Sequence, residues 1–339
     1  MNSRSSVLRF AFLITVSLAC FGARAIAQPK VSPEEQKAYD AWVSAPDAVK
    51  AQVAEEFVKK FPKSSLRATM AQKIVDQIRE LTNAEQKITV AQQFKSIFNN
   101  PDEEEMIMPV LIVGYADAKK PDDAFTSGSA YLGQHPDAVS VLVELMFIAT
   151  DQAKQKNGKF VLQGDQYGVH GAELIEANKK PASMDDATWK EYRDLLPRIY
   201  QSLGILGLVK ADNAAAQARF IKASELDPKD PLNFLFLAGA INTDYQQAAK
   251  KYQTMSDGPD RDAQLKKVYA LLDRMIEADA HFLGLSDGNA QLAAVRQQEM
   301  QYLETNYKFR HEGKTDGMQQ LIDKYKAGPA KPKDPFAIP

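Results

Sequence analysis

Residues 197–231 of this 339-residue chain read PRIYQSLGILGLVKADNAAAQARFIKASELDPKDP. Both halves of the stretch carry residues three and four apart, as on one face of a helix. These residues are Tyr200, Leu203, Gly204 and Gly207 in the first half and Ala216, Phe220 and Ala223 in the second. Because proline cannot continue a helix and disfavours helical angles in the residue before it, the second helix should end before Pro228. The stretch therefore predicts two helices folded back on each other.

This helix pair resembles a tetratricopeptide repeat, whose pattern is an aromatic residue, Leu-Gly, then Ala, Phe, Ala and a closing Pro. The residues that keep the mutual spacing of that pattern are Leu203, Gly204, Ala216, Phe220, Ala223 and Pro228. The resemblance is clearest at 197–231. It implies a helical solenoid that binds other proteins or peptides, and it does not identify the partner.

A weaker copy of the pattern lies at about 105–137. Ala124 precedes Pro136 by 12 residues, which is also the separation of Ala216 and Pro228. Gly128 stands where the pattern has its aromatic residue. Further helix breaks fall at Pro62, Pro101 and Pro181. Two intervals between successive breaks are clearly longer than the roughly 34 residues of the family, so we expect insertions in the array.

We predict an all-α chain in which antiparallel helix pairs stack as a right-handed, tetratricopeptide-like solenoid with irregular insertions. The expected organisation is an N-terminal array at 31–178, a C-terminal array at 185–327 and a flexible tail at 328–339. The segment 178–187, NKKPASMDDA, is the expected hinge because its proline breaks a helix and Ser183 or Asp185 can cap the next one. The polar, glycine-containing segments 154–165 and 256–261 are predicted loops.

The first 27 residues have the pattern of a signal peptide. Arg4 and Arg9 give a positive start, an apolar run follows at 10–22, and small residues precede a cleavage site after Ala27. The apolar run is shorter than the roughly 20 residues of a membrane-spanning helix. We therefore expect a periplasmic or secreted protein with no transmembrane segment in the mature chain. The alternative is a lipoprotein signal, SLAC at 17–20, with a lipid anchor at Cys20.

The sequence offers little catalytic chemistry. The formal charge of −2 argues against nucleic acid as a partner, because phosphate binding needs a concentrated basic face. None of the four histidines has another four residues away, as a helical zinc pair requires, and no phosphate-binding loop is present. We predict no catalytic, cofactor or metal site, and no enzyme activity. The cluster GDQYGVHG at 164–171 has two interpretations: a loop that exposes Asp165 and His170 to a ligand, or a helix start in which Gly171 permits close packing.

In a tetratricopeptide solenoid, the first helix of each pair lines a concave surface that takes a peptide. The resemblance places on that surface the candidate groove residues Val143, Phe147, Arg198, Gln201, Ile205, Leu208, Leu235, Asn242 and Thr243. The alternative is that the apolar ones pack beneath an adjacent insertion. We expect an exported scaffold that binds a protein or peptide in the cell envelope. The other functions left open are an accessory subunit of an envelope assembly or secretion complex, and a hydrolase on a helical scaffold.

Overall fold

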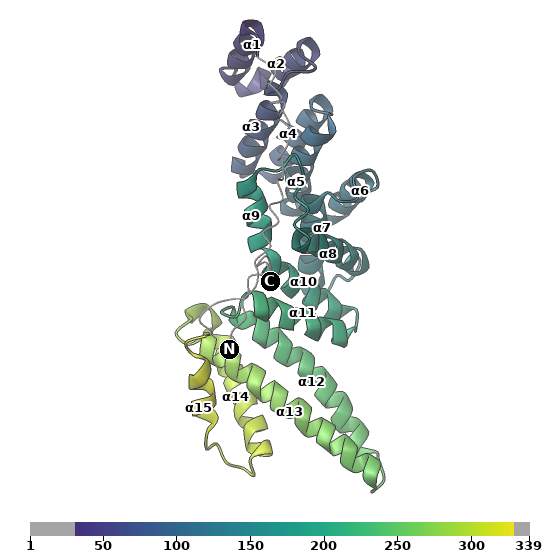
Figure 1. Ribbon diagram of the computed structural model, residues 1–339, viewed down its shortest axis with the longest axis vertical. Coiled ribbons are helices and arrows are strands. Elements are labelled where there is room, and N and C mark those ends of the chain that lie inside the picture. The colour runs from purple at the N-terminus through teal and green to yellow at the C-terminus, as the bar shows by residue number, and fades with distance from the viewer. Residues whose placement is uncertain (1–30, 329–339) are drawn as a thin grey trace, which may run out of the picture.

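The computed structural model describes residues 31–328, which form an elongated stack of helices (Figure 1). The described residues contain no strand, and the predicted all-α fold is confirmed. The predicted signal peptide, Cys20 and nearly all of the predicted tail lie outside the described residues. The helices are α1 (Pro33–Val43), α2 (Asp47–Lys60), α3 (Leu66–Glu80), α4 (Ala84–Ile97), α5 (Pro101–Asp117), α6 (Pro121–Leu132), α7 (Val139–Lys154), α8 (Val161–Glu176), α9 (Asp186–Asp194), α10 (Leu196–Val209), α11 (Asn213–Leu226), α12 (Pro231–Gln253), α13 (Pro259–Leu285), the short 3-10 helix η1 (Ala290–Leu292), α14 (Ala293–Arg310) and α15 (Met318–Tyr325).

Local sequence signals set many of the helix ends. At the start of α1, the Ser32 hydroxyl accepts a hydrogen bond from the Glu35 backbone N–H at 3.2 Å, and the Glu35 carboxylate accepts one from the Ser32 N–H at 2.7 Å. Asp212 caps α11 with a single hydrogen bond, which its carboxylate accepts from the Ala215 N–H. Proline occupies the first turn of α1, α5, α6, α12 and α13, where its missing N–H costs nothing.

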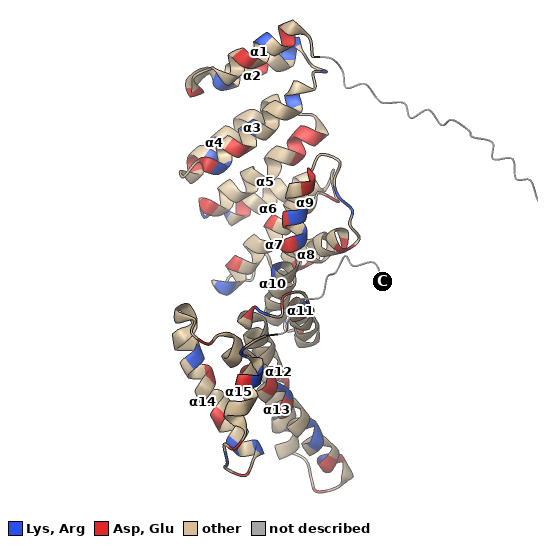
Figure 2. Ribbon diagram, turned by 60° about the vertical axis from the view of Figure 1, so that its left-hand side comes forward, with Lys and Arg blue, Asp and Glu red and all other residues tan. Residues whose placement is uncertain are grey.

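The helices stack as antiparallel pairs. The first helices α3, α5, α7, α10 and α12 pack on one another in that order. The second helix of each pair also packs on the next first helix: α4 on α5, α6 on α7, α8 on α10 and α11 on α12. The chain is therefore a helical solenoid. Acidic and basic segments are interspersed along it (Figure 2).

The pair α10–α11 packs as the 197–231 pattern predicts. Phe220 is fully buried, and a Cβ added to Gly204 would lie only 2.4 Å from its Cε1 atom. Gly207 approaches the backbone of Ala216 in the same interface. In the weaker copy, Gly128 has no side chain where the pattern has its aromatic ring. A Leu145 methyl group from α7 lies in that space.

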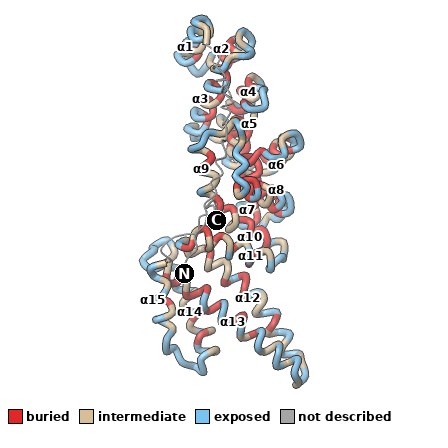
Figure 3. The backbone as a smooth tube through the Cα atoms, viewed as in Figure 1, coloured by how far each residue is buried: buried red, intermediate tan, exposed pale blue. Residues whose placement is uncertain are grey.

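The hydrophobic core does not divide at the predicted hinge. One cluster of buried residues runs from Trp42 to Leu226 and so includes residues on both sides of 178–187. A second cluster runs from Ala238 to Ile322, and a third, small group contains Ala216, Phe220 and Ala240. Buried positions recur along the stack of helices (Figure 3). The change from one core to the next therefore falls at α12, not at 178–187. From there the chain continues as the long pair α12–α13, onto which α14 and α15 fold back.

The segment 178–194 packs on the array and does not form an open hinge. Asp185 caps α9 by accepting a hydrogen bond from the Thr188 N–H at 2.7 Å. Met184 and Tyr192 pack against the first core, and Ser183 donates a hydrogen bond to Glu105 of α5. In Figure 1, α9 lies alongside the first helices of the N-terminal array. The predicted loops at 154–165 and 256–261 are shorter than expected, because α8 begins at residue 161 and α13 at residue 259.

Candidate functional site

The structure separates the predicted groove residues instead of bringing them together. Val143 is fully buried, and a Cβ added to Gly171 of α8 would lie 3.3 Å from its Cγ2 atom. It is therefore a core residue and not part of an open surface. Phe147 and Arg198 do meet: the guanidinium carbon lies 5.1 Å from the ring centroid, a cation–π contact. Phe147 also packs against the first core.

The middle of the predicted groove is occupied by packing within the protein. The Gln201 amide donates hydrogen bonds to Asp230 at 2.9 Å and to Asn233 at 2.8 Å. Ile205 and Leu208 are partly buried against the small core around Phe220. Ile205 and Leu208 thus pack against α11 and α12 of the array, and not beneath an insertion. Thr243 is exposed on α12, and its hydroxyl donates to the Gly239 carbonyl at 3.3 Å.

The remaining two predicted residues, Leu235 and Asn242, line an open cavity of about 460 Å³. Its lining comes from three helices, α12, α13 and α14, and we call it the C-terminal groove. The lining residues are Leu235, Ala238, Gly239, Asn242 and Gln246 of α12, Met275 and Asp279 of α13, and Glu299, Tyr302, Thr305 and Asn306 of α14. Ala238 and Met275 are buried, whereas Tyr302 is 54% exposed. The groove thus combines an apolar floor with an accessible aromatic wall.

The C-terminal groove contains two acidic side chains, Asp279 and Glu299, whose pKa values are raised. Asp279 is only 3% exposed, and burial raises the pKa of its carboxyl group well above the ordinary value, with the nearby charge of Glu299 adding to the effect. Burial also raises the pKa of Glu299. Within residues 31–328, neither carboxyl group has a hydrogen bond or an ion pair. The groove therefore has acceptor groups that the described chain does not use.

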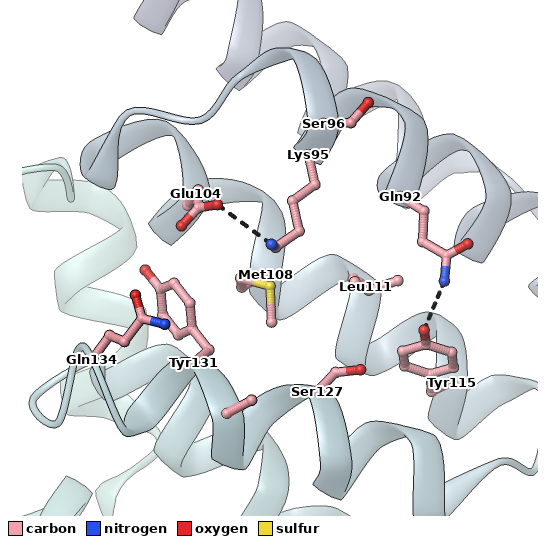
Figure 4. A pocket seen from close by; sticks show the side chains of 11 residues that line it. Gln92, Lys95, Ser96, Glu104, Met108, Leu111, Tyr115, Ser127, Tyr131 and Gln134 are labelled. Atoms are coloured by element: carbon pink, nitrogen blue, oxygen red, sulfur yellow. Dashed lines mark hydrogen bonds and ion pairs between the residues drawn. The ribbon is translucent and has the colours of Figure 1, made fainter.

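A second cavity, of about 470 Å³, lies among α4, α5 and α6 (Figure 4). Most of its polar side chains already have partners. Lys95 pairs with Glu104 at 3.3 Å, and the Gln92 amide donates to the Tyr115 hydroxyl at 2.8 Å. The Tyr131 hydroxyl is buried without a hydrogen bond in the described part of the chain, and burial raises its pKa. Because its charged groups neutralise each other, this cavity offers a ligand less than the C-terminal groove does.

The sequence cluster at 164–171 is part of helix α8 and not a ligand-binding loop. Its glycines allow close packing: a Cβ added to Gly168 would lie 2.4 Å from Met146 of α7. Asp165 is buried and pairs with Lys210 at 2.5 Å and with Arg219. The His170 Nε2 atom lies 2.7 Å from the Asp137 carboxylate. The packing interpretation is therefore correct for this cluster.

Comparisons with known proteins add little to this picture. No protein-family model matches the chain, and no curated protein matches it. Among solved structures, it is similar to a tetratricopeptide repeat protein from Parabacteroides merdae. The two chains share 12% identity at a TM-score of 0.38, over 85% of this chain and 95% of that one.

Residues 31–328 show neither a membrane-spanning helix nor a metal-binding cluster. No helix in that range is both long and apolar enough to span a membrane. Nor do three or more His, Cys, Asp or Glu side chains gather there as a metal site would require.

Sequence reasoning missed Asp279, Glu299 and Tyr302. A signal for Asp279 was present, because this acid interrupts the apolar stripe of α13 that holds Leu272, Ile276 and Leu283. Such a stripe normally faces the core, so an acid within it points to a partner or a ligand. No comparable signal marks Glu299 or Tyr302, because their role depends on where α14 lies relative to α12.

Proposed function

We propose that the mature chain is an exported, tetratricopeptide-like scaffold and that its C-terminal groove binds a protein or peptide partner. The observation that carries this proposal is the open stripe on α12, which faces the exposed Tyr302 across a buried floor. The stripe runs from Leu235 to Gln246, about 16 Å at 1.5 Å per residue, which matches about three turns of a bound helix. A Cβ added to Gly239 would meet nothing within 4 Å, so a partner backbone can approach closely there. An amphipathic segment laid into such a groove is a common mode of peptide recognition.

Export is supported by the signal-peptide pattern of the first 27 residues. The mass of the protein purified from an envelope fraction tests this part of the proposal. We expect a mature chain that begins at Gln28. A mass that corresponds to a chain beginning at an acylated Cys20 would instead show that the scaffold is lipid-anchored.

Two exposed aromatic residues on α14 provide a matched test of partner binding. Tyr302 lines the C-terminal groove, whereas Phe309 is 62% exposed and does not line it. A photoreactive amino acid at position 302 should crosslink to a discrete protein in intact cells, and the same amino acid at position 309 should not. Equal crosslinking at the two positions, or none at either, would show that the groove is not the binding site.

Quantitative binding of the crosslinked protein completes the test. Buried aromatic anchors often contribute 2 kcal/mol or more at interfaces. Tyr302→Ala should therefore weaken binding of the purified partner by about 30-fold, and Phe309→Ala by no more than about twofold. Both variants should keep the wild-type helical content, since both side chains are exposed.

A further inference from the structure

The C-terminal groove contains a buried acid that peptide binding alone does not explain. Asp279 lines the groove at 3% exposure, beside the apolar Ala238 and Met275. Within residues 31–328 its carboxyl group has no hydrogen bond or ion pair. Burial of an unpaired polar group costs free energy, and an apolar residue here would make the fold more stable. The position of Asp279 therefore points to a ligand outside the described chain.

The charges around Asp279 indicate the chemistry of that ligand. From α14, the groove receives a second acid, Glu299, together with the neutral Thr305 and Asn306. From α12 it receives Asn242 and Gln246, which are uncharged. No lysine or arginine of the described chain lines the groove. The groove thus holds two acids and several amide oxygens without a positive charge to balance them.

We propose that the C-terminal groove recognises an organic cation, namely the side-chain ammonium or guanidinium of a lysine or arginine in the bound peptide. Asp279 is the buried acceptor and Glu299 the second acceptor. The alkyl stem of the cationic side chain lies on the apolar floor, and the face of Tyr302 adds a cation–π partner. This inference rests on the proposed function and names the feature of the partner that the groove selects.

Proton linkage gives the proposal a characteristic pH dependence. A cation binds to ionised Asp279, but burial and the charge of Glu299 hold its carboxyl group in the protonated form to higher pH than usual. Binding should therefore release a proton, and the affinity should rise as pH rises. The rise is up to about tenfold per pH unit while the free carboxyl group remains protonated.

Calorimetric titration of the mature protein with small probes tests the proposal. The probes are n-pentylammonium for lysine, n-butylguanidinium for arginine and 1-pentanol as the neutral control. We expect at least one cation to bind, with 1-pentanol at least about 30-fold weaker. Asp279→Asn should weaken cation binding by about 30-fold or more and remove the pH dependence. Asp262→Asn, at the exposed start of the same helix, is the matched control and should bind as the wild type does.

Three results would overturn the inference. The first is that 1-pentanol binds as tightly as the cations, and the second is that Asp279→Asn binds the cations as the wild type does. The third is that Asp279→Asn is less stable than the wild type at neutral pH, because that loss would assign the carboxyl group a structural partner. If Tyr302→Ala weakens partner binding but Asp279→Asn does not, the groove binds its partner without a cation and only this inference fails. If neither substitution weakens partner binding, the proposed function fails as well.

Discussion

Gly204 of α10 lies directly against the Phe220 ring of α11, and its replacement by alanine tests the packing of the repeat. A Cβ at this position would lie 2.4 Å from Cε1 of Phe220 and 2.7 Å from Cδ1 and Cζ of the same ring. Because the ring is fully buried, it cannot move aside without disturbing the core. Overpacking of this kind costs about 3 kcal/mol at the upper end of its range, whereas Gly→Ala in a helix otherwise gains about 1 kcal/mol. We therefore expect Gly204→Ala to lose about 2 kcal/mol of unfolding free energy.

A matched control and a double variant make the test of Gly204→Ala specific. Gly239 is also inside a helix, but an added Cβ there meets nothing within 4 Å, so Gly239→Ala should gain up to about 1 kcal/mol. Phe220→Ala alone should lose about 3–5 kcal/mol because it leaves a cavity. In the double variant Gly204→Ala/Phe220→Ala the added methyl group enters that cavity. The double variant should therefore be no less stable than Phe220→Ala.

Urea unfolding followed by far-UV circular dichroism measures these differences. The reasoning is wrong if Gly204→Ala is as stable as the wild type. It is equally wrong if the losses of the two single variants add up in the double variant, because independent effects would mean that the new methyl group and the ring do not collide.

Two further predictions concern buried charges. Burial raises the pKa of Glu144 on α7 to about 7, against the opposing charges of Arg198 and Arg79. Between pH 4.5, the ordinary pKa, and about pH 7, the folded chain keeps a proton that the unfolded chain has lost. The free energy of unfolding should therefore fall by about 3 kcal/mol as pH rises through this window. Urea midpoints measured across the window should show this fall in the wild type and not in Glu144→Gln. Arg67 and Glu103 form a buried pair with two 2.7 Å hydrogen bonds, so Arg67→Met should lose about 3–5 kcal/mol by leaving the carboxylate unpaired. Arg67→Met/Glu103→Leu should recover part of that loss in the same urea assay, and a single variant of wild-type stability would contradict the prediction.

The helices were predictable because local signals determine them. Proline breaks, capping side chains and apolar residues three and four apart all act within a few residues of chain. The helix end expected before Pro228, for example, is found at Leu226, the last residue of α11. The pattern of 197–231 correctly predicted two helices folded back on each other, and Phe220 of the second helix packs against Gly204 of the first.

The candidate site was predictable only in part, because it depends on contacts between distant segments. Val143 was misplaced because α7 is buried on nearly all sides, so its periodicity does not distinguish a groove face from a core face. Leu235 and Asn242 line an open cavity, but the wall opposite them belongs to α14, which starts more than 50 residues later in the sequence. Nothing local in the sequence specifies that α14 folds back onto α13 beside α12.

The segment 178–194, which contains α9, changes how the helix pairs before it fold. In a plain stack of helix pairs each pair touches only its neighbours, so structure can form or melt from either end. Here the Ser183 hydroxyl reaches Glu105, 78 residues earlier in the chain. Contacts of such sequence separation close long loops and slow the folding of a chain relative to a stack with local contacts only. Because the segment can dock only once α5 and α7 are in place, it joins separate pairs into one cooperative unit at the cost of a slower route to the folded state.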